Sequence, residues 1–302
     1  IMGFSGLAFR VRWWWRKAEF PGWCPSTPVG EFPEELAATA NGTGWKLRVI
    51  DEMADEKAPH MERYKADIVA SIDAGKPVPA YPGGLNVGVI FGYEDGGKTF
   101  LIRDYFKGDE VLRQPAEKIG PMLIILQERG EALSRRGALI QAMRIAVTNW
   151  SRAVVRGEKG GYYYGDEAMA RWIEDLAGHD KWDEEQRKGL FFANWWNYEA
   201  LADARKSAAE FLGARTDVLS GPAADAVKRA AETYAKEAKL LGPVCDKRGV
   251  FFGPWSGKKQ EDWTAAVRQR EQAVLAEARK LEASAVAEMA KALAAERART
   301  AP

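Results

Sequence analysis

The chain is predicted to be an α+β protein in two parts, a domain at residues 1–130 with a mainly antiparallel sheet and a helical domain at residues 131–302. Short apolar runs of strand length dominate the first part. From about Glu131 onward, apolar residues instead recur every three or four positions, which is the period of a helix. The length of 302 residues also exceeds the usual size of one domain, so two units are expected.

The first part is predicted to alternate helices and strands. Pro33 favours a helix start, and Asn41-Gly42 favours its end about two turns later. Residues 45–50 alternate apolar and basic side chains like a half-buried strand. A second helix carries Met61, Tyr64, Ile68 and Ile72 on one face and ends at Gly75. Four further strands are expected at residues 77–81, 86–93, 98–104 and 122–127.

The second part is predicted to be a bundle of five helices. Their expected ranges are 131–154, 165–176, 195–212, 222–241 and 261–299. Gly178 is expected to stop the second helix, and Gly242-Pro243 the fourth. The last helix is long, rich in alanine and mixed in charge. Two interpretations of it stay open: it packs on its own chain, or it offers a surface for a protein partner or for self-association.

Composition and charge exclude several classes of partner. The 44 Lys and Arg residues nearly cancel the 43 Asp and Glu residues, so no overall field favours nucleic acid or an anionic membrane. No apolar run approaches the roughly 20 residues of a membrane helix. The two cysteines, Cys24 and Cys245, give no disulfide framework, which fits a reducing compartment. We therefore expect a cytoplasmic protein without a nucleic-acid or membrane partner.

Residues 86–104 are predicted to form a β-hairpin. The tripeptide 94–96 suits a three-residue loop with its glycine in the left-handed conformation. Tyr93 would then pair with Gly97, and counting outward places Asn86 opposite Asp104 on the same face. A carboxylate in that position could orient a base at position 86, which is half of a constellation of nucleophile, base and carboxylate. Asn86 and Asp104 are therefore the candidate catalytic positions.

The stretch from Ile68 to Asp104 resembles bacterial papain-like proteins of two kinds, the bacteriocin-processing cysteine peptidases and the N-terminal domain of the butirosin-biosynthesis acyltransferase. Their pattern is a helix, a Gly-x-Pro-Val strand, a histidine before an apolar strand and Gly-Tyr, and a return strand that ends in Asp. The matching residues here are Gly75, Pro77, Val78, Gly92, Tyr93 and Asp104. The resemblance covers about the first 130 residues and implies a papain-like fold there.

The same resemblance implies that the catalytic chemistry has been changed. Asn86 occupies the place of the family's histidine, and an amide side chain is no general base at any accessible pH. By this resemblance, the family's catalytic cysteine would lie upstream of Ile1 or be absent. Cys24, which follows Trp23 and lies near basic residues, is the alternative nucleophile, although a half-buried structural thiol is the simpler interpretation.

A ligand site is predicted beside the hairpin. The glycine-rich loop with Tyr81, Gly83 and Gly84, together with Tyr93, would form the lip of a pocket for a small apolar or acyl ligand if an aromatic cluster faces it. The clusters at residues 13–15, 162–164 and 195–196 otherwise fill the core or a domain interface. No spacing typical of a metal or cofactor site is present, so neither is expected.

Three functions remain open at this level. The leading hypothesis is a non-catalytic papain-like scaffold, a pseudoenzyme, that binds a small ligand or a protein partner through the old cleft. The second is a cysteine-dependent acyltransferase or amide hydrolase whose nucleophile lies upstream of residue 1. The third is a structural protein whose helices build an assembly.

Overall fold

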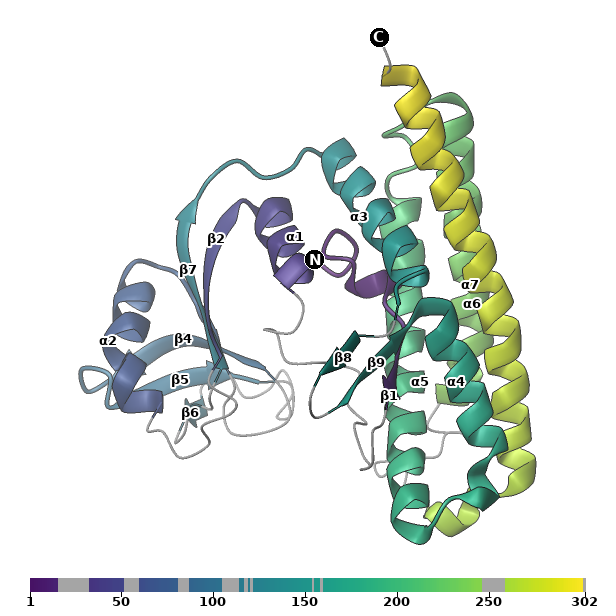
Figure 1. Cartoon of the computed structure of the whole chain (residues 1–302). Helices are drawn as coiled ribbons and strands as arrows, with labels where there is room; N and C mark the ends of the chain where they lie inside the picture. Colours follow the sequence, from purple (N-terminus) through teal and green to yellow (C-terminus); the bar gives the residue numbers. More distant parts are fainter. Residues whose placement is uncertain are drawn as a thin grey trace. The chain divides into compact units, whose positions relative to one another are not determined.

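The computed structural model describes residues 1–15, 33–51, 60–80, 87–104, 114–116, 119, 122–153, 155–157, 160–245 and 259–300 (Figure 1). It confirms the α+β class, with an antiparallel sheet in the first half of the chain and a helical second half. The chain forms two compact units, which we call the sheet unit and the helical unit. The sheet unit comprises Pro28–Leu36 and Thr43–Ala132; the helical unit comprises Ile1–Thr27, Ala37–Gly42 and Leu133–Pro302.

The first residues of the chain group with the helices, whereas the sequence assigned them to the sheet domain. The reason is the apolar character of the opening segment. Ala8 and Phe9 are buried in the same core as Leu139, Tyr234 and other residues of the long helices. The opening segment, which includes a 3₁₀ turn at Leu7–Phe9, thus becomes part of the core of the second half of the chain.

The sheet unit is built on six antiparallel strands in the order β2-β7-β3-β4-β5-β6. Their bounds are Trp45–Asp51 (β2), Val78–Ala80 (β3), Gly88–Glu94 (β4), Thr99–Arg103 (β5), Gln114–Ala116 (β6) and Met122–Arg129 (β7). All four strands and the β2 segment expected from the sequence are present. The short strand β6 was not predicted.

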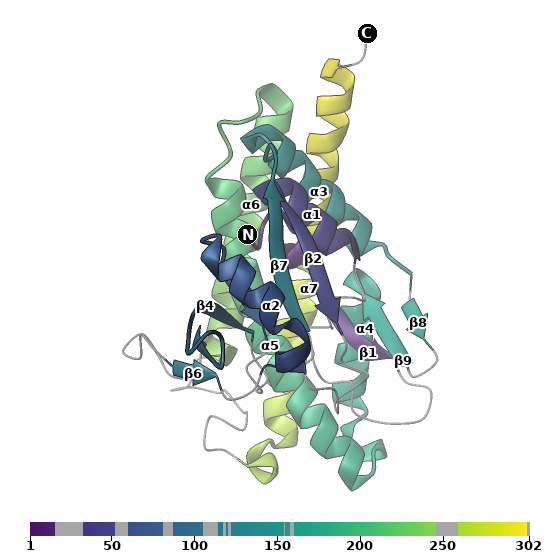
Figure 2. The ribbon, with the colours of Figure 1, turned by 90° about the vertical axis from the view of Figure 1, so that its left-hand side faces the viewer.

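Helix α2 (His60–Asp73) covers one face of this sheet, as Figure 2 shows for its course across β7. Its Ile68 is fully buried against strand residues such as Ile90 and Phe100. Successive strand side chains point to opposite faces, so Val89 and Phe91 of β4 are exposed while Ile90 is buried. The core of the sheet unit therefore lies between α2 and the sheet.

The described part of the helical unit contains five helices of 13 residues or more and a small sheet. The helices are α3 (Arg135–Trp150), α4 (Gly165–Ala177), α5 (Glu184–Gly213), α6 (Gly221–Cys245) and α7 (Ala265–Thr300), and α1 (Pro33–Thr43) joins the two units in sequence. Short 3₁₀ turns precede them at Leu7–Phe9 (η1), His179–Lys181 (η3) and Gln260–Asp262 (η4). Helix α7 packs along α6 and also contacts α3 and α4 (Figure 1).

The small sheet joins two of the aromatic clusters. Strand β1 (Arg12–Trp15) pairs with β9 (Gly160–Tyr164), which in turn pairs with β8 (Val155–Gly157). Trp13 lies opposite Tyr163 in the β1–β9 ladder, and its ring stacks on Trp172 of α4 at 5.0 Å between centroids. The Trp13 indole also donates to Asp175 at 2.7 Å. The sequence showed the two clusters but not that they are neighbours.

Several predicted helix ends are wrong. Helix α3 is shorter than the expected range 131–154: it begins at Arg135, where the Ser134 side chain accepts from Gly137 N, and ends at Trp150. Helix α1 continues through Asn41-Gly42 to Thr43, and Gly44 takes the left-handed φ of 75° instead. Helix α5 begins at Glu184, earlier than expected, because Asp183 and Gln186 form a reciprocal capping box. Helix α6 runs through Pro243 to Cys245. A proline near the last turn removes one backbone donor but does not force the chain to leave the helix there.

In the described part of the chain, no helix is both long and apolar enough to cross a lipid bilayer.

Candidate functional site

Most of the predicted site lies outside the described residues. Asn86, Cys24, Tyr81, Gly83 and Gly84 all fall there. Asp104 and Tyr93 are described and can be placed. Their surroundings test two parts of the prediction: the register of the hairpin and the role of the Tyr93 ring.

The predicted register of the β4–β5 hairpin is wrong. The structure pairs Glu94 with Thr99 and, beyond a bulge at Phe91, Val89 with Arg103. Continuing this ladder by one step brings Asp104 opposite Gly88 rather than opposite position 86. The prediction that Asn86 pairs with Asp104 depended on the predicted register, so it is no longer supported.

The turn explains the shift. The carbonyl of Glu94 accepts a hydrogen bond from Gly97 N at 2.9 Å, and both residues between them have positive φ, 49° at Asp95 and 64° at Gly96. This is the pattern of a type I′ turn, whose twist suits a hairpin, in place of the expected type I turn. Gly97 also has positive φ, 85°, which lengthens the loop to four residues.

Tyr93 has a structural partner. Its hydroxyl donates to Asp73 Oδ1 at 2.7 Å and so ties β4 to the end of α2. This hydrogen bond to the carboxylate, with smaller effects of burial and of the Asp73 charge, raises the pKa of Tyr93 above its ordinary value. The predicted role of Tyr93 in ligand binding remains a prediction.

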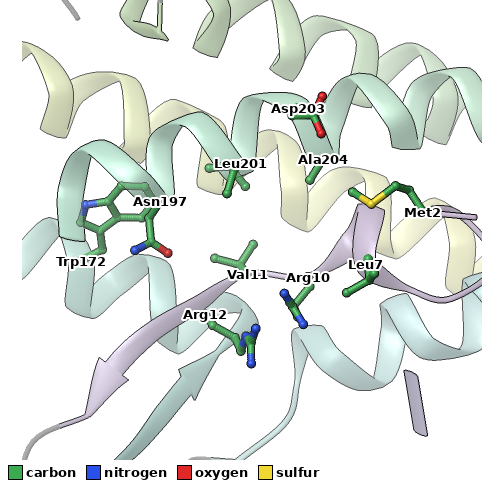
Figure 3. A pocket seen from close by; sticks show the side chains of 11 residues that line it. Met2, Leu7, Arg10, Val11, Arg12, Trp172, Asn197, Leu201, Asp203 and Ala204 are labelled. Atoms are coloured by element: carbon green, nitrogen blue, oxygen red, sulfur yellow. The ribbon is translucent and has the colours of Figure 1, made fainter. Parts of the chain in front are cut away.

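A pocket of about 300 Å³ lies within the helical unit (Figure 3). Its walls come from the opening segment of the chain, from α4 and from one face of α5. The lining residues are Met2, Leu7, Arg10, Val11, Arg12, Trp172, Asn197, Ala200, Leu201, Asp203 and Ala204. Residues near the chain start and residues nearly 200 positions later thus share one site.

Two arginines lie on the same side of the opening segment. Arg10 has extended backbone angles, φ −84° and ψ 133°, as the segment leaves η1 and enters β1. In extended chain the side chains alternate, so Arg10 and Arg12 point one way and Val11 the other. Figure 3 shows this alternation, with Val11 on the α5 side and the side chains of Arg10 and Arg12 on the other side of the segment.

Gly6 sets the course of this segment. Its φ of 87° is in the left-handed region, and a Cβ there would lie 2.3 Å from a side-chain carbon of Ile145 on α3. A larger residue would therefore be strained and would also push the segment off α3. The 3₁₀ turn η1 begins at the next residue, so Gly6 determines where the arginine-bearing stretch starts.

The polar groups of the pocket are mixed but mainly positive. Arg12 is only 3% exposed and lies over the Tyr162 ring, 5.1 Å from its centroid. Asn197 is buried, and its amide nitrogen donates to Ala193 O at 2.8 Å, which fixes the orientation of the amide. Asp203 lines the exposed rim. The lining residues thus include two guanidinium groups and one carboxylate.

The remaining walls are apolar and rigid. Leu201 and Val11 are buried, and Leu7 and Met2 are half-buried. Trp172 is fully buried between the stacked ring of Trp13 and the edge of Tyr198, whose centroid lies 4.9 Å away. Its indole nitrogen donates to Asn194 at 2.8 Å. These contacts hold the pocket wall in one arrangement before any ligand arrives.

Sequence reasoning missed this pocket, although one signal was present. Arg10-Val11-Arg12 alternates charged and apolar residues directly before a tryptophan, which is the pattern of an extended segment with two like charges on one side. The α5 residues gave no separate signal, because Leu201 and Ala204 belong to an ordinary apolar stripe.

Among the described residues, no group of three or more His, Cys, Asp or Glu side chains is placed to hold a metal ion. No known protein family and no curated protein matches the chain in sequence comparisons. The functional argument therefore depends on the geometry of the pocket.

Proposed function

We propose that the helical unit binds a small organic anion in the pocket between the opening segment and α5. The observation that carries the proposal is the pair Arg10 and Arg12, which extend to the same side of one segment and line the same pocket. An anion that both guanidinium groups contact would be held by two positive charges at once.

The chemistry of guanidinium groups suits this role. Each presents a planar fork of donors that matches a carboxylate, sulfonate or phosphate, and such charge-assisted bonds are about twice as strong as neutral ones. The burial of Arg12 excludes water and strengthens the interaction further.

The pocket also limits the size and shape of the ligand. A volume of about 300 Å³ is at the lower end for small-molecule sites, which are roughly 300–1,000 Å³. Leu7, Val11 and Leu201 offer an apolar wall opposite the charges. The ligand class that fits is a compact molecule with one acidic group and one apolar body.

The papain-like relationship of the sheet unit is a separate proposal. It is supported by the sequence motif from Gly75 to Val78 and by Gly92-Tyr93. It predicts a cysteine shortly upstream of Ile1 if the chain is an acyltransferase or hydrolase, and sequencing the gene upstream tests this. The cytoplasmic location and a partner for the last helix likewise remain proposals.

A pair of fluorescent probes tests anion binding. Anilinonaphthalene sulfonate carries an acidic group, and phenylnaphthylamine has the same rings without the charge. We expect the protein to bind the sulfonate at least about tenfold more tightly, because one hydrogen bond to a charged group contributes roughly 1.5–3 kcal/mol. Titration by fluorescence gives both dissociation constants.

The matched variants separate the pocket from the rest of the surface. Replacing both Arg10 and Arg12 by Gln should remove the preference for the sulfonate and leave binding of the amine nearly unchanged. Replacing Arg171 and Arg229 by Gln, which removes two exposed arginines of the same unit that do not line the pocket, should change neither. Equal affinity of the unmodified protein for the two probes would contradict the proposal, as would a preference that survives the first double substitution.

A further inference from the structure

A buried ionic cluster lies directly behind the pocket wall. It consists of Arg205 on α5, Tyr234 and Glu237 on α6, and Glu282 on α7, and we call it the arginine cluster. All four side chains are fully buried. Arg205 follows Ala204 and lies one helical turn beyond Leu201, both of which line the pocket.

Arg205 connects this cluster to the segment that carries the pocket arginines. Its Nε donates to Glu282 Oε2 at 2.6 Å. Its Nη1 donates to the carbonyl oxygen of Ala8 at 2.9 Å and to that of Arg10 at 3.5 Å. One guanidinium thus fixes the backbone on both sides of Phe9, at the start of the stretch that carries the two arginines of the pocket lining.

The close packing of these groups shifts the pKa values of Arg205 and Glu237. Burial raises the pKa of Glu237 well above its ordinary value, and the charge of Glu282 raises it further. Burial lowers the pKa of Arg205, but the charges of Glu282 and Glu237 outweigh it and raise the pKa overall. The Tyr234 hydroxyl donates to Glu282 Oε1 at 3.0 Å. Burial and the charge of Glu282 therefore favour the protonated form of Glu237, while the two glutamates favour the charged form of Arg205.

We infer that Arg205 is a positioning residue for the anion pocket: it holds the carbonyl groups of Ala8 and Arg10 so that Arg10 and Arg12 face the ligand. The inference rests on the proposed function. The fork geometry is essential to it, because Nε and Nη1 serve two different partners at once. The Glu282 carboxylate keeps the fork in the orientation that reaches the opening segment.

Arg205→Lys tests the inference, since lysine keeps the charge but has all its donors on a single atom. The expected result is a selective one. The affinity for anilinonaphthalene sulfonate falls about tenfold, while the affinity for phenylnaphthylamine stays as in the unmodified protein. A general loosening of the bundle would instead change both affinities together.

Arg229→Lys is the matched control. Arg229 on α6 also donates through Nε to a glutamate of α7, Glu288, at 2.7 Å, but it is half exposed and does not contact the opening segment. It should leave both affinities unchanged. If Arg205→Lys does not unfold cooperatively, Glu282→Gln replaces it; this change keeps an oxygen acceptor for Nε, and it should lower the sulfonate affinity in the same selective way.

Amide hydrogen exchange gives a readout that needs no ligand. Phe9 N and Arg10 N donate to Gly6 O and Leu7 O in the 3₁₀ turn. In Arg205→Lys we expect these two amides to exchange about tenfold faster, as expected when the local opening free energy falls. Amides of the β2–β7 ladder should not change.

The outcomes distinguish the two proposals. If the unmodified protein shows no preference for the sulfonate, the proposed function fails and the inference fails with it. If the preference exists but survives in Arg205→Lys with unchanged exchange at Phe9 and Arg10, only the inference is overturned.

Discussion

Two groups of buried carboxyl side chains in the helical unit differ in whether a cation contacts them directly. The arginine cluster sets Arg205 against Glu282 and Glu237. The second group consists of Trp172, Asn194, Trp263 and Glu271, and we call it the indole cluster. There Glu271 Oε2 accepts from Asn194 Nδ2 at 3.0 Å and from Trp263 Nε1 at 2.8 Å.

The difference shows two ways in which a bundle can keep an acidic group inside. In the indole cluster, burial raises the pKa of Glu271 to about 7, and the hydrogen bonds from Trp263 and Asn194 offset only part of that rise. In the arginine cluster, burial and the charge of Glu282 raise the pKa of Glu237, and the charge of Arg205 opposes only part of that rise. The neutral donors of the indole cluster thus leave a titration near neutral pH, whereas the arginine cluster sets a guanidinium directly against its carboxyl groups.

Removing the cation should have the largest effect. Arg205→Met leaves Glu282 and Glu237 buried without a positive partner, so we expect a loss of about 3–5 kcal/mol in the free energy of unfolding, measured with urea. Replacing Arg205, Glu237 and Glu282 together by apolar residues should cost much less, because no charge is then left buried. A loss below about 1 kcal/mol for the single change would show that the cluster does not hold its charges as described.

The pH dependence of stability should sharpen the comparison next. Glu271 has a folded pKa of about 7, above the ordinary value of 4.5. Below pH 4.5 both states are protonated, and the stability from this group is fully present. As pH rises to 7, only the unfolded state loses its proton, so stability falls by roughly 3 kcal/mol in total and then levels off.

Glu271→Gln removes this titration while keeping an oxygen acceptor for both donors. We expect the difference in unfolding free energy between pH 5 and pH 8 to be smaller in the variant than in the unmodified protein, with most of the change below pH 7. Parallel pH profiles of the two proteins would show that Glu271 is ionised in the folded state at neutral pH.

A smaller effect is expected for the Tyr234 hydroxyl. Tyr234→Phe removes the hydrogen bond to Glu282 Oε1 and leaves the packing of the ring intact. The free energy of unfolding should fall by about 1–2 kcal/mol, because the bond is made to a charged acceptor in a buried site. Thermal and urea unfolding measure this change. A change indistinguishable from zero would mean that the hydrogen bond from Tyr234 to Glu282 does not stabilise the fold.

The smallest effect is expected for the same type of ion pair at the surface. Arg229 pairs with Glu288 across α6 and α7, and its side chain is 53% exposed. Arg229→Ala should change the unfolding free energy by no more than about 1 kcal/mol, and less at high salt. If the unfolding free energy fell as much as in Arg205→Met, burial would not explain why the two ion pairs contribute differently to stability.

The elements of the fold were predictable where the signal is local. Helix α2 and its end at Gly75 follow from apolar spacing and one glycine with positive φ, and both are observed. The hairpin register was not predictable to the residue, because type I and type I′ turns both accept Asp-Gly and a bulge at Phe91 adds a further step. The start of α5 was missed because its first turns carry mainly polar residues, although the Asp183–Gln186 capping box was visible in the sequence.

The pocket was not predictable in the same way. Its two arginines could be recognised in the sequence as an alternating pair. The other lining residues, such as Asn197 and Leu201, lie on α5, far away in sequence. What brings them together is the burial of Ala8 and Phe9 in the helical core and the bonds from Arg205 to the carbonyl groups around them. Such contacts depend on tertiary packing, which cannot be predicted from helical periodicity or from local propensity.

The central claim is that Arg10 and Arg12 receive an anion, and a crystal structure of the protein with anilinonaphthalene sulfonate tests it most directly. We expect the sulfonate oxygens at about 2.7–2.9 Å from guanidinium nitrogens of both residues, with the naphthalene ring against Leu201. Electron density for the probe at another place, or a sulfonate that faces solvent while the ring alone occupies the pocket, would contradict the claim.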